Sequence, residues 1–129
     1  MMSTLLTAES DFIAVAEVAD RYVRGLHHAD TALLAQITDP DLLLMAPGVR
    51  RNRTQWLTLV ASRPVPAKTG AEFNYQLQSI SLHGSQASVR IYCPLLGEHY
   101  LDLLTLHRTA DGWIIVNKAY ASYPAGWPI

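Results

Sequence analysis

Hydrophobic and polar positions divide the chain into a helical first half and a strand-rich second half. Apolar residues between positions 12 and 26 recur three and four positions apart, the spacing of one helical face: Phe12, Val15, Ala16, Ala19, Tyr22, Val23 and Leu26. Thr7 is the expected N-cap of this helix. Asp30 is placed to cap a short second helix, and Thr54 a third that carries Trp56, Leu57 and Val60.

The second half alternates apolar and polar residues with the two-residue period of strands. Strands are predicted at 73–82, 88–93, 100–108 and 113–121, after an earlier short strand at 42–45. The alternation changes parity between Leu77 and Ile80, which indicates a β-bulge near Ser79. Helices followed by an antiparallel sheet predict an α+β fold in a single domain spanning residues 1–129.

The last two predicted strands are apolar on both faces. A sheet with this pattern has to be covered on both sides. Helices would cover one face, and a second copy of the chain would cover the other. The pattern therefore predicts a homodimer formed through the β-sheet.

Composition narrows the possible functions. The 129 residues are 50% hydrophobic and only 16% charged, against about 25% charged in ordinary domains, which excludes intrinsic disorder. A net charge of -1 provides no basic field for nucleic acid or an anionic membrane. The single cysteine, Cys93, excludes an intramolecular disulfide and a zinc site built from cysteines.

The chain shows no pattern typical of a targeting or membrane-spanning segment. No Lys or Arg precedes the short apolar pair Leu5 and Leu6, so the start does not resemble a signal peptide. No segment approaches the roughly 18 apolar residues of a membrane span. We expect a soluble, cytoplasmic protein.

The histidines do not form a metal-ligand pattern. His27 and His28 are adjacent on a predicted helix and would point about 100° apart. The other three histidines are not spaced as ligands on one helix or strand: His83, His99 and His107. We expect neither a metal nor another cofactor.

Three stretches carry a resemblance to a known family: residues 22–30 (YVRGLHHAD), 39–41 (DPD) and 113–118 (WIIVNK). The order of elements resembles the nuclear-transport-factor-two-like superfamily, whose cone-shaped fold is shared with ketosteroid isomerases and SnoaL-type polyketide cyclases. Within it, these stretches look like the family called putative lumazine-binding, and the likeness spans residues 12–120. It implies a cystatin-like fold, in which a curved antiparallel sheet wraps around N-terminal helices and leaves a cavity at its open end.

The resemblance also allows the isomerase chemistry to be checked. In those enzymes a tyrosine on the first helix and a second acid polarise a carbonyl, while an aspartate at the end of the first strand moves the proton. Tyr22 lies in the stretch that resembles the tyrosine-bearing segment, but Ala46 occupies the expected aspartate position and Thr105 that of the second acid. Neither side chain can accept and return a proton near neutral pH. We predict no catalytic residue and no ketosteroid isomerase activity.

The function with most support from the sequence is the binding of a small, largely apolar organic molecule in that cavity. Such sites combine apolar walls with a few fixed polar groups. The candidate lining residues are Tyr22, Met45, Trp56 and Asn117, with His99 at the cavity mouth.

The sequence also contains a possible ion pair and a basic cluster. If Asn117 faces the cavity, its neighbour Lys118 faces the outer sheet surface, where Asp102 on the adjacent strand is its natural partner. The arginines at positions 50, 51 and 53 form a short basic cluster, which either holds an anionic substrate group or is simply solvated.

Two other functions remain open at this stage. One is an enzyme of the isomerase, cyclase or dehydratase type, using Tyr22 or His99 on a steroid- or polyketide-like substrate. The other is a dimeric protein-interaction module whose cavity has no ligand.

Overall fold

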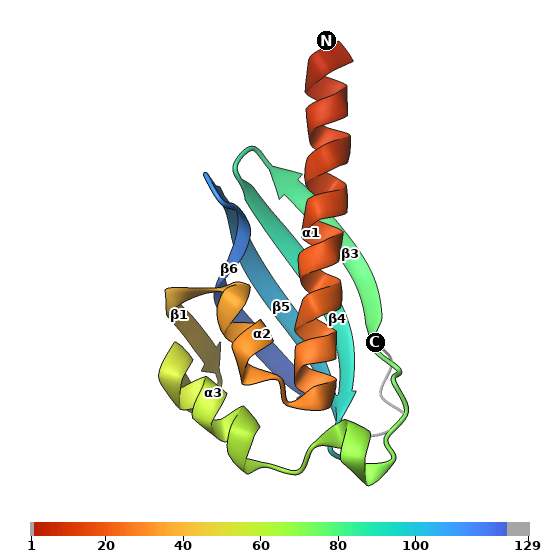
Figure 1. The fold of residues 1–129 in the computed structure, drawn as a ribbon, viewed down its shortest axis with the longest axis vertical. Coiled ribbons are helices and arrows are strands. Elements are labelled where there is room, and N and C mark those ends of the chain that lie inside the picture. The colour runs from red at the N-terminus through yellow and green to blue at the C-terminus, as the bar shows by residue number, and fades with distance from the viewer. Residues whose placement is uncertain (1, 124–129) are drawn as a thin grey trace.

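The first helix lies along the concave face of a curved sheet, as Figure 1 shows, and the buried residues of its apolar stripe belong to the hydrophobic core. The computed structural model describes residues 2–123. Its helices are α1 (Met2–His28), α2 (Thr31–Gln36), α3 (Arg53–Ser62) and a 3-10 helix, η1 (Pro66–Thr69). Its strands are β1 (Thr38–Ala46), β2 (Val49–Asn52), β3 (Gln76–His83), β4 (Gln86–Leu95), β5 (Glu98–Thr109) and β6 (Gly112–Tyr123).

The six strands form one sheet in the order β2-β1-β6-β5-β4-β3. After β1 and β2 the chain crosses through α3 and η1 to the far edge, then returns by antiparallel hairpins from β3 to β6. The last strand therefore meets β1 running in the same direction, and this pair is parallel. The α+β fold is as predicted, but the sheet is mixed rather than antiparallel throughout.

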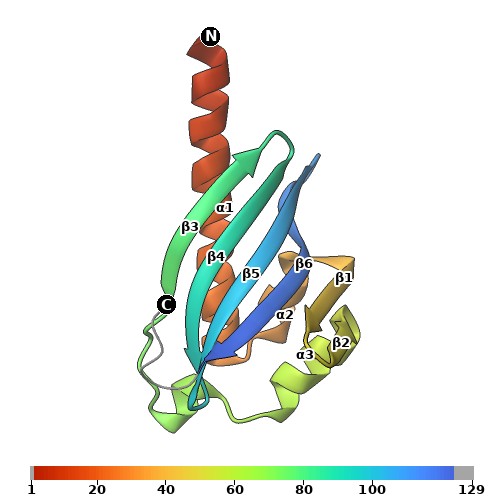
Figure 2. The same ribbon diagram turned by 180° about the vertical axis from the view of Figure 1, so that it is seen from behind.

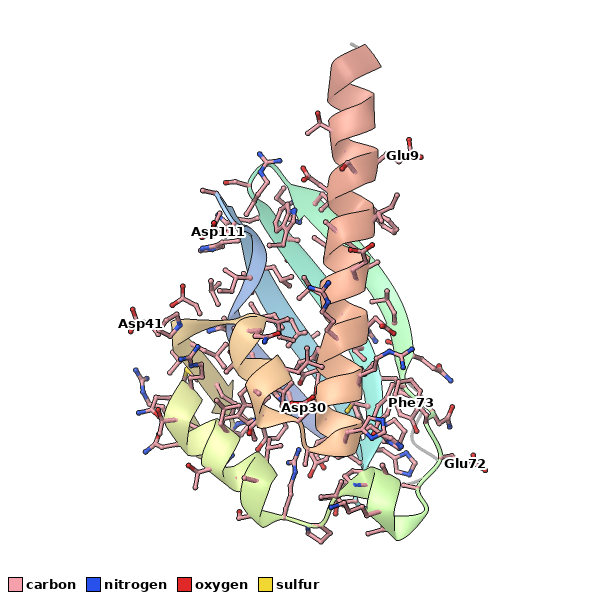
Figure 3. All side chains as sticks on the ribbon, viewed as in Figure 1. Glu9, Asp30, Asp41, Glu72, Phe73 and Asp111 are labelled. Atoms are coloured by element: carbon pink, nitrogen blue, oxygen red, sulfur yellow. The ribbon has the colours of Figure 1, made fainter. Side chains whose placement is uncertain are left out.

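Helix α1 is buried only along the part that crosses the sheet. Tyr22 and Val15 are fully buried there, and Leu26 nearly so. Near the end of the sheet, Asp11 still accepts hydrogen bonds from Arg108 and Trp113, whereas Phe12 is 48% exposed. Further toward the N-terminus the helix extends past the sheet, and Glu9 projects outward (Figure 3). The helix also continues through Thr7, so the expected N-cap at this residue is wrong.

The close contact between α1 and α2 depends on a glycine. Asp30 caps α2 as predicted, because its side chain accepts a hydrogen bond from the Leu33 N–H at 3.1 Å. On the neighbouring turn of α1, a Cβ at Gly25 would lie 2.5 Å from the Leu34 Cδ2 atom. Only a residue without a side chain fits this approach.

Helix α3 begins earlier than the sequence suggested. Its N-cap is Asn52, not Thr54. The Asn52 side chain accepts a hydrogen bond from the Gln55 N–H, and the Gln55 side chain accepts one from the Asn52 N–H, which completes a capping box. The strand β2 precedes this helix and carries Arg50 and Arg51 of the basic cluster at the sheet edge.

Two irregularities in strand pairing set which side chains face inward. In β3 the register shifts between Leu77 and Ser79, which confirms the predicted bulge. In β6 the partners of Thr105 and Leu106 are Asn117 and Ile115, so β6 carries one extra residue between them. Because side chains alternate along a strand, this extra residue reverses the inward-facing set beyond it.

The outer face of the sheet is not covered by any helix of the described range, as Figure 2 shows from behind. Leu103 is 45% exposed and Met45 is 40% exposed. This surface is where the predicted second copy of the chain would have to bind. No helix within residues 2–123 is long and apolar enough to cross a membrane.

Candidate functional site

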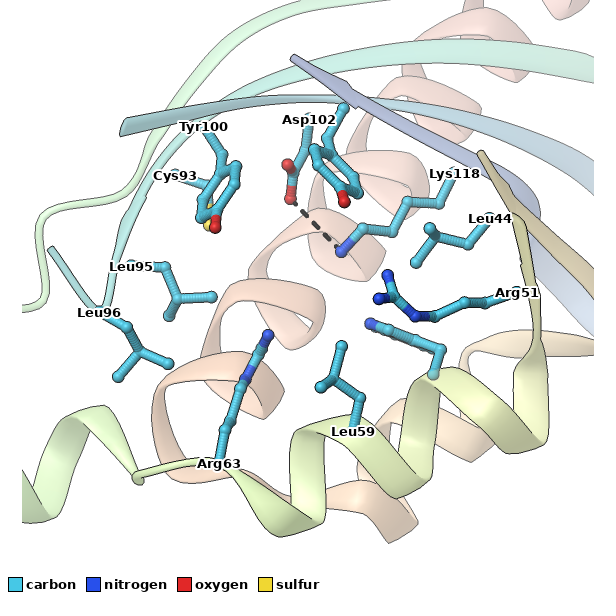
Figure 4. Close-up of a pocket in the computed structure, with 12 residues that line it drawn as sticks. Leu44, Arg51, Leu59, Arg63, Cys93, Leu95, Leu96, Tyr100, Asp102 and Lys118 are labelled. Carbon is cyan, nitrogen blue, oxygen red and sulfur yellow. Dashed lines mark ion pairs between the residues drawn. The ribbon is translucent and has the colours of Figure 1, made fainter. Parts of the chain in front are cut away.

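A half-enclosed pocket of about 260 Å³ opens between α3, the sheet and the β4–β5 turn (Figure 4). This is slightly below the usual range of about 300–1,000 Å³ for ligand pockets, so it suits a compact molecule. Its wall combines leucine and tryptophan side chains with arginines and tyrosines, and its floor carries a buried pair of opposite charges. The lining residues are Leu44, Arg51, Trp56, Leu59, Arg63, Cys93, Leu95, Leu96, Tyr100, Asp102, Lys118 and Tyr120.

The floor of the pocket is a buried network around Asp102. Lys118 Nζ lies 3.7 Å from Asp102 Oδ2, and their side chains are only 8% and 4% exposed. The Tyr22 hydroxyl donates to the same Oδ2 at 2.6 Å. The Lys118 ammonium also lies 4.9 Å from the centre of the Trp56 ring and 5.0 Å from that of Tyr22. Aromatic faces attract a cation, so these rings partly compensate for its lost hydration.

The bulge in β6 explains why Lys118 points inward. Ile115 is buried in the core, so a regular strand would also direct Asn117 inward and Lys118 outward. The extra residue exchanges these directions, and Lys118 pairs across to Leu44 and Leu104 on the inner face. The predicted partnership of Lys118 with Asp102 is confirmed, but the predicted outer location is wrong.

Burial determines the protonation behaviour of this network. Desolvation lowers the pKa of Lys118, an effect that the charge of Asp102 opposes and that of Arg63 reinforces. Burial, followed by the charge of Asp102, raises the pKa of Tyr22 well above its ordinary range. Burial likewise raises the pKa of the Cys93 thiol. Tyr22 and Cys93 are therefore neutral at physiological pH, and the thiol is a poor nucleophile.

Two arginines approach the pocket from opposite sides. Arg51 comes from β2, and Arg63 follows the last turn of α3, where its backbone N–H bonds to the Leu59 carbonyl. Figure 4 shows both guanidinium groups pointing into the pocket. The Nη2 atom of Arg63 is buried without a hydrogen-bond partner in the described structure.

The β4–β5 turn holds the rim of the pocket in a costly conformation. Leu96 has a φ of 52° and is followed by Gly97 at 83°. Two successive positive φ values are typical of the tight turns that join hairpin strands, where Asn and Gly are favoured. A leucine pays a steric penalty there, yet Leu96 supplies an apolar wall.

Of the five predicted lining residues, two lie at the pocket and three lie elsewhere on the sheet. Trp56 lines the pocket, and Tyr22 lies fully buried beneath it. Met45 and Asn117 lie on the outer face, because their strand neighbours Leu44 and Lys118 face inward. His99 lies at a separate recess near the β4–β5 turn, and its Nδ1 is 2.7 Å from the Tyr92 hydroxyl oxygen.

Several lining residues were not singled out from the sequence. Leu59 was visible only as part of an apolar helix, and Arg63 stands alone before Pro64 with no pattern around it. Asp102 and Lys118 were recognised as a pair but assigned to the other face. The acid beside Tyr22 is Asp102, whereas Thr105 lies three residues further along β5. Among the described residues, no group of three His, Cys, Asp or Glu side chains is arranged to hold a metal ion.

Residues 10–121 match the family described as "Putative lumazine-binding". No curated protein matches the chain.

Solved structures share the fold at low sequence identity. An NTF2-like protein of unknown function from Shewanella baltica OS155 has a TM-score of 0.76 and 17% identity, over 90% of this chain and 96% of that one. One from Silicibacter pomeroyi DSS-3 has a TM-score of 0.72 and 19% identity, over 91% and 98% of the two chains. An NTF2-like protein with a cystatin-like fold from Novosphingobium aromaticivorans has a TM-score of 0.71 and 16% identity, over 97% and 90%.

Proposed function

We propose that this chain, which belongs to the family described as putative lumazine-binding, binds a small organic molecule in the pocket under α3. The observation that carries the proposal is the contrast between the pocket's wall and its floor. Leucine and tryptophan side chains supply the apolar part of the wall, while the floor holds the buried Lys118–Asp102 pair. A mostly apolar cavity with a few convergent polar groups is the usual form of a ligand site.

Blocking the pocket tests this proposal. Leu59 lines the pocket from α3, whereas the adjacent Thr58 is exposed on the same helix. A panel of small aromatic and aliphatic compounds is screened by thermal shift against the wild type, Leu59→Trp and Thr58→Trp. Compounds that stabilise the wild type should lose their effect in Leu59→Trp and keep it in Thr58→Trp. Equal effects in both variants would contradict binding in this pocket.

A proton-transfer enzyme is the second candidate, and one observation favours it. The Asp102 carboxylate lines the pocket and accepts a hydrogen bond from Tyr22, so a tyrosine and an acid lie together. However, the Tyr22 proton is directed to Asp102 and its side chain is fully buried, so this donor does not reach a substrate carbonyl. Binding without turnover remains the leading proposal. An assay with an unsaturated ketosteroid tests the alternative, and turnover above the buffer rate would favour it.

A homodimer through the outer face of the sheet completes the proposal. Support comes from the apolar side chains on that face, where Leu103 and Met45 remain about half exposed. Asn117 lies on the same face, between Leu43 and Thr105 on the neighbouring strands. A closed two-fold pair would remove this surface from water.

A further inference from the structure

We propose that the ligand of this pocket carries a carboxylate, and that Arg63 and Arg51 receive it. This inference rests on the proposed binding function and names the chemical class of the ligand. Arg51 belongs to the basic cluster for which the sequence left open a role in holding an anionic group, whereas Arg63 was not singled out from the sequence.

The charges that line the pocket do not balance. Arg51, Arg63 and Lys118 contribute three cations, and Asp102 contributes a single anion. Asp102 is already engaged by Lys118 and by the Tyr22 hydroxyl. The two guanidinium groups are therefore in excess within a half-enclosed pocket, where a ligand anion would be attracted.

One nitrogen of the Arg63 guanidinium group lacks a hydrogen-bond acceptor within residues 2–123. Its Nη2 is buried and has no acceptor in the described structure. A buried donor without a partner lacks the hydrogen bonds that it would make in water, which costs free energy. The same side chain points into the pocket in Figure 4. An anionic oxygen bound here would supply the missing acceptor.

A carboxylate fits this position better than a phosphate. The planar guanidinium matches the two oxygens of a carboxylate in a paired, charge-assisted contact. Arg63 follows the C-terminal end of α3, whose carbonyls carry partial negative charge and disfavour a dianion more than a monoanion. Beside it, Leu59, Leu95 and Leu96 offer an apolar surface for the rest of the ligand. The expected ligand is a compact aryl or alkyl monocarboxylic acid.

Isothermal titration of the whole chain with three probes tests the inference: 4-phenylbutyrate, its neutral amide 4-phenylbutyramide, and inorganic phosphate. The acid should bind the wild type at least about 10-fold more tightly than the amide, the usual scale for hydrogen bonds to charged groups. Arg63→Gln should remove that preference while leaving amide binding within about 2-fold, since only the anionic contact is lost. Arg50→Gln is the matched control, because it removes an equal charge from an exposed neighbour of Arg51 and should retain the preference.

The remaining outcomes separate this inference from the binding function itself. Equal binding of acid and amide would overturn the carboxylate assignment and leave the binding function supported. Arg63→Gln weakening both probes alike would assign Arg63 a structural role and also overturn it. Binding of phosphate alone would replace carboxylates with phosphates as the ligand class. Failure of all three probes to bind the wild type would contradict the inference and count against the binding function as well.

Discussion

Lys118 is the residue at which burial and charge conflict most strongly. Its ammonium group is removed from water and contacts one carboxylate and two aromatic rings. Such a pair adds little net stability compared with apolar residues, but loss of one partner leaves an uncompensated buried charge. A role of the Lys118–Asp102 pair in ligand binding therefore explains its presence better than a contribution to stability does.

The first prediction concerns the loss of one charge. Lys118→Met should lower the free energy of unfolding by about 3–5 kcal/mol, because Asp102 is left buried without its cation. The double variant Lys118→Met with Asp102→Leu should recover part of that loss, which a denaturant-based double-mutant cycle measures. Arg24→Met is the control, since it breaks an exposed pair with Asp20 and should cost less than about 1 kcal/mol. A loss this small at Lys118 would contradict its burial.

The second prediction concerns the Tyr22 hydroxyl. Tyr22→Phe removes its hydrogen bond to Asp102 and should cost about 1.5–3 kcal/mol at pH 8. Tyr120→Phe is the control, because the Tyr120 hydroxyl makes no hydrogen bond within the described range. It should be nearly neutral in urea unfolding.

The difference in unfolding free energy between the wild type and Tyr22→Phe should depend on pH, and the sign of this dependence follows from the pKa of Tyr22. Burial and Asp102 raise the pKa of Tyr22 above its ordinary 10.0, so the folded chain keeps a proton that the unfolded chain loses. The stability contributed by Tyr22 is therefore complete below pH 10 and declines as the pH rises through and beyond that value. The advantage of the wild type over Tyr22→Phe should shrink between pH 10 and pH 11. A constant difference would show that Tyr22 ionises normally in the fold.

At the scale of secondary structure, α3 forms one wall of the pocket and β6 carries its cation. The capping box of Asn52 and Gln55 fixes where α3 begins. That start sets the helical phase of Trp56 and Leu59, which face the pocket one turn apart.

The third prediction separates the observed cap from the one expected from sequence. Asn52→Ala should destabilise the protein by about 1 kcal/mol, because the Gln55 N–H loses its acceptor. Thr54→Ala lies inside the first turn and should cost less than about 0.5 kcal/mol. Thermal or urea unfolding measures both variants. A larger effect at Thr54 would mean that the helix starts two residues later.

Sequence patterns predicted the helices and strands well. They predicted less well which face of the sheet each strand side chain occupies. Helical spacing located α1 and Trp56, and the parity change in β3 revealed its bulge. The bulge in β6 left no such signal, because residues 113–116 are apolar whichever way they face. One undetected residue was enough to exchange Asn117 for Lys118 in the pocket.

The parts of the site that escaped prediction depend on long-range geometry. Arg63 reaches the pocket because α3 crosses over the sheet, a relation that local spacing does not contain. The mixed sheet has the same origin, since the parallel β1–β6 pair joins strands from opposite ends of the chain. The general family resemblance could supply the fold and the cavity, but not the identity of the residues facing it.

At the scale of the whole molecule, the two faces of the sheet differ. The concave face holds the helices and the pocket, while the outer face in Figure 2 has no covering helix in the described range. Exposed leucine and methionine on such a face favour association with an apolar partner.

The fourth prediction is the homodimer through this outer face. Light scattering at micromolar concentration should give about twice 14.3 kDa. Leu103→Lys places a charge at the centre of the face and should shift the chain toward the monomer. His107→Lys is the control on the same strand, in an exposed position beyond the apolar patch. A wild-type chain that stays monomeric at high concentration would contradict the proposed interface.

The most direct test of the binding function is a ¹H–¹⁵N NMR titration with a panel of small aryl acids and amides. Ligands that bind should shift the Trp56 indole and the amides of Leu59, Leu96 and Lys118 together, since all four residues line the pocket. The Trp113 indole, which bonds to Asp11 away from the pocket, should remain unchanged. Shifts that gather elsewhere on the molecule, with these pocket signals unmoved, would contradict the account.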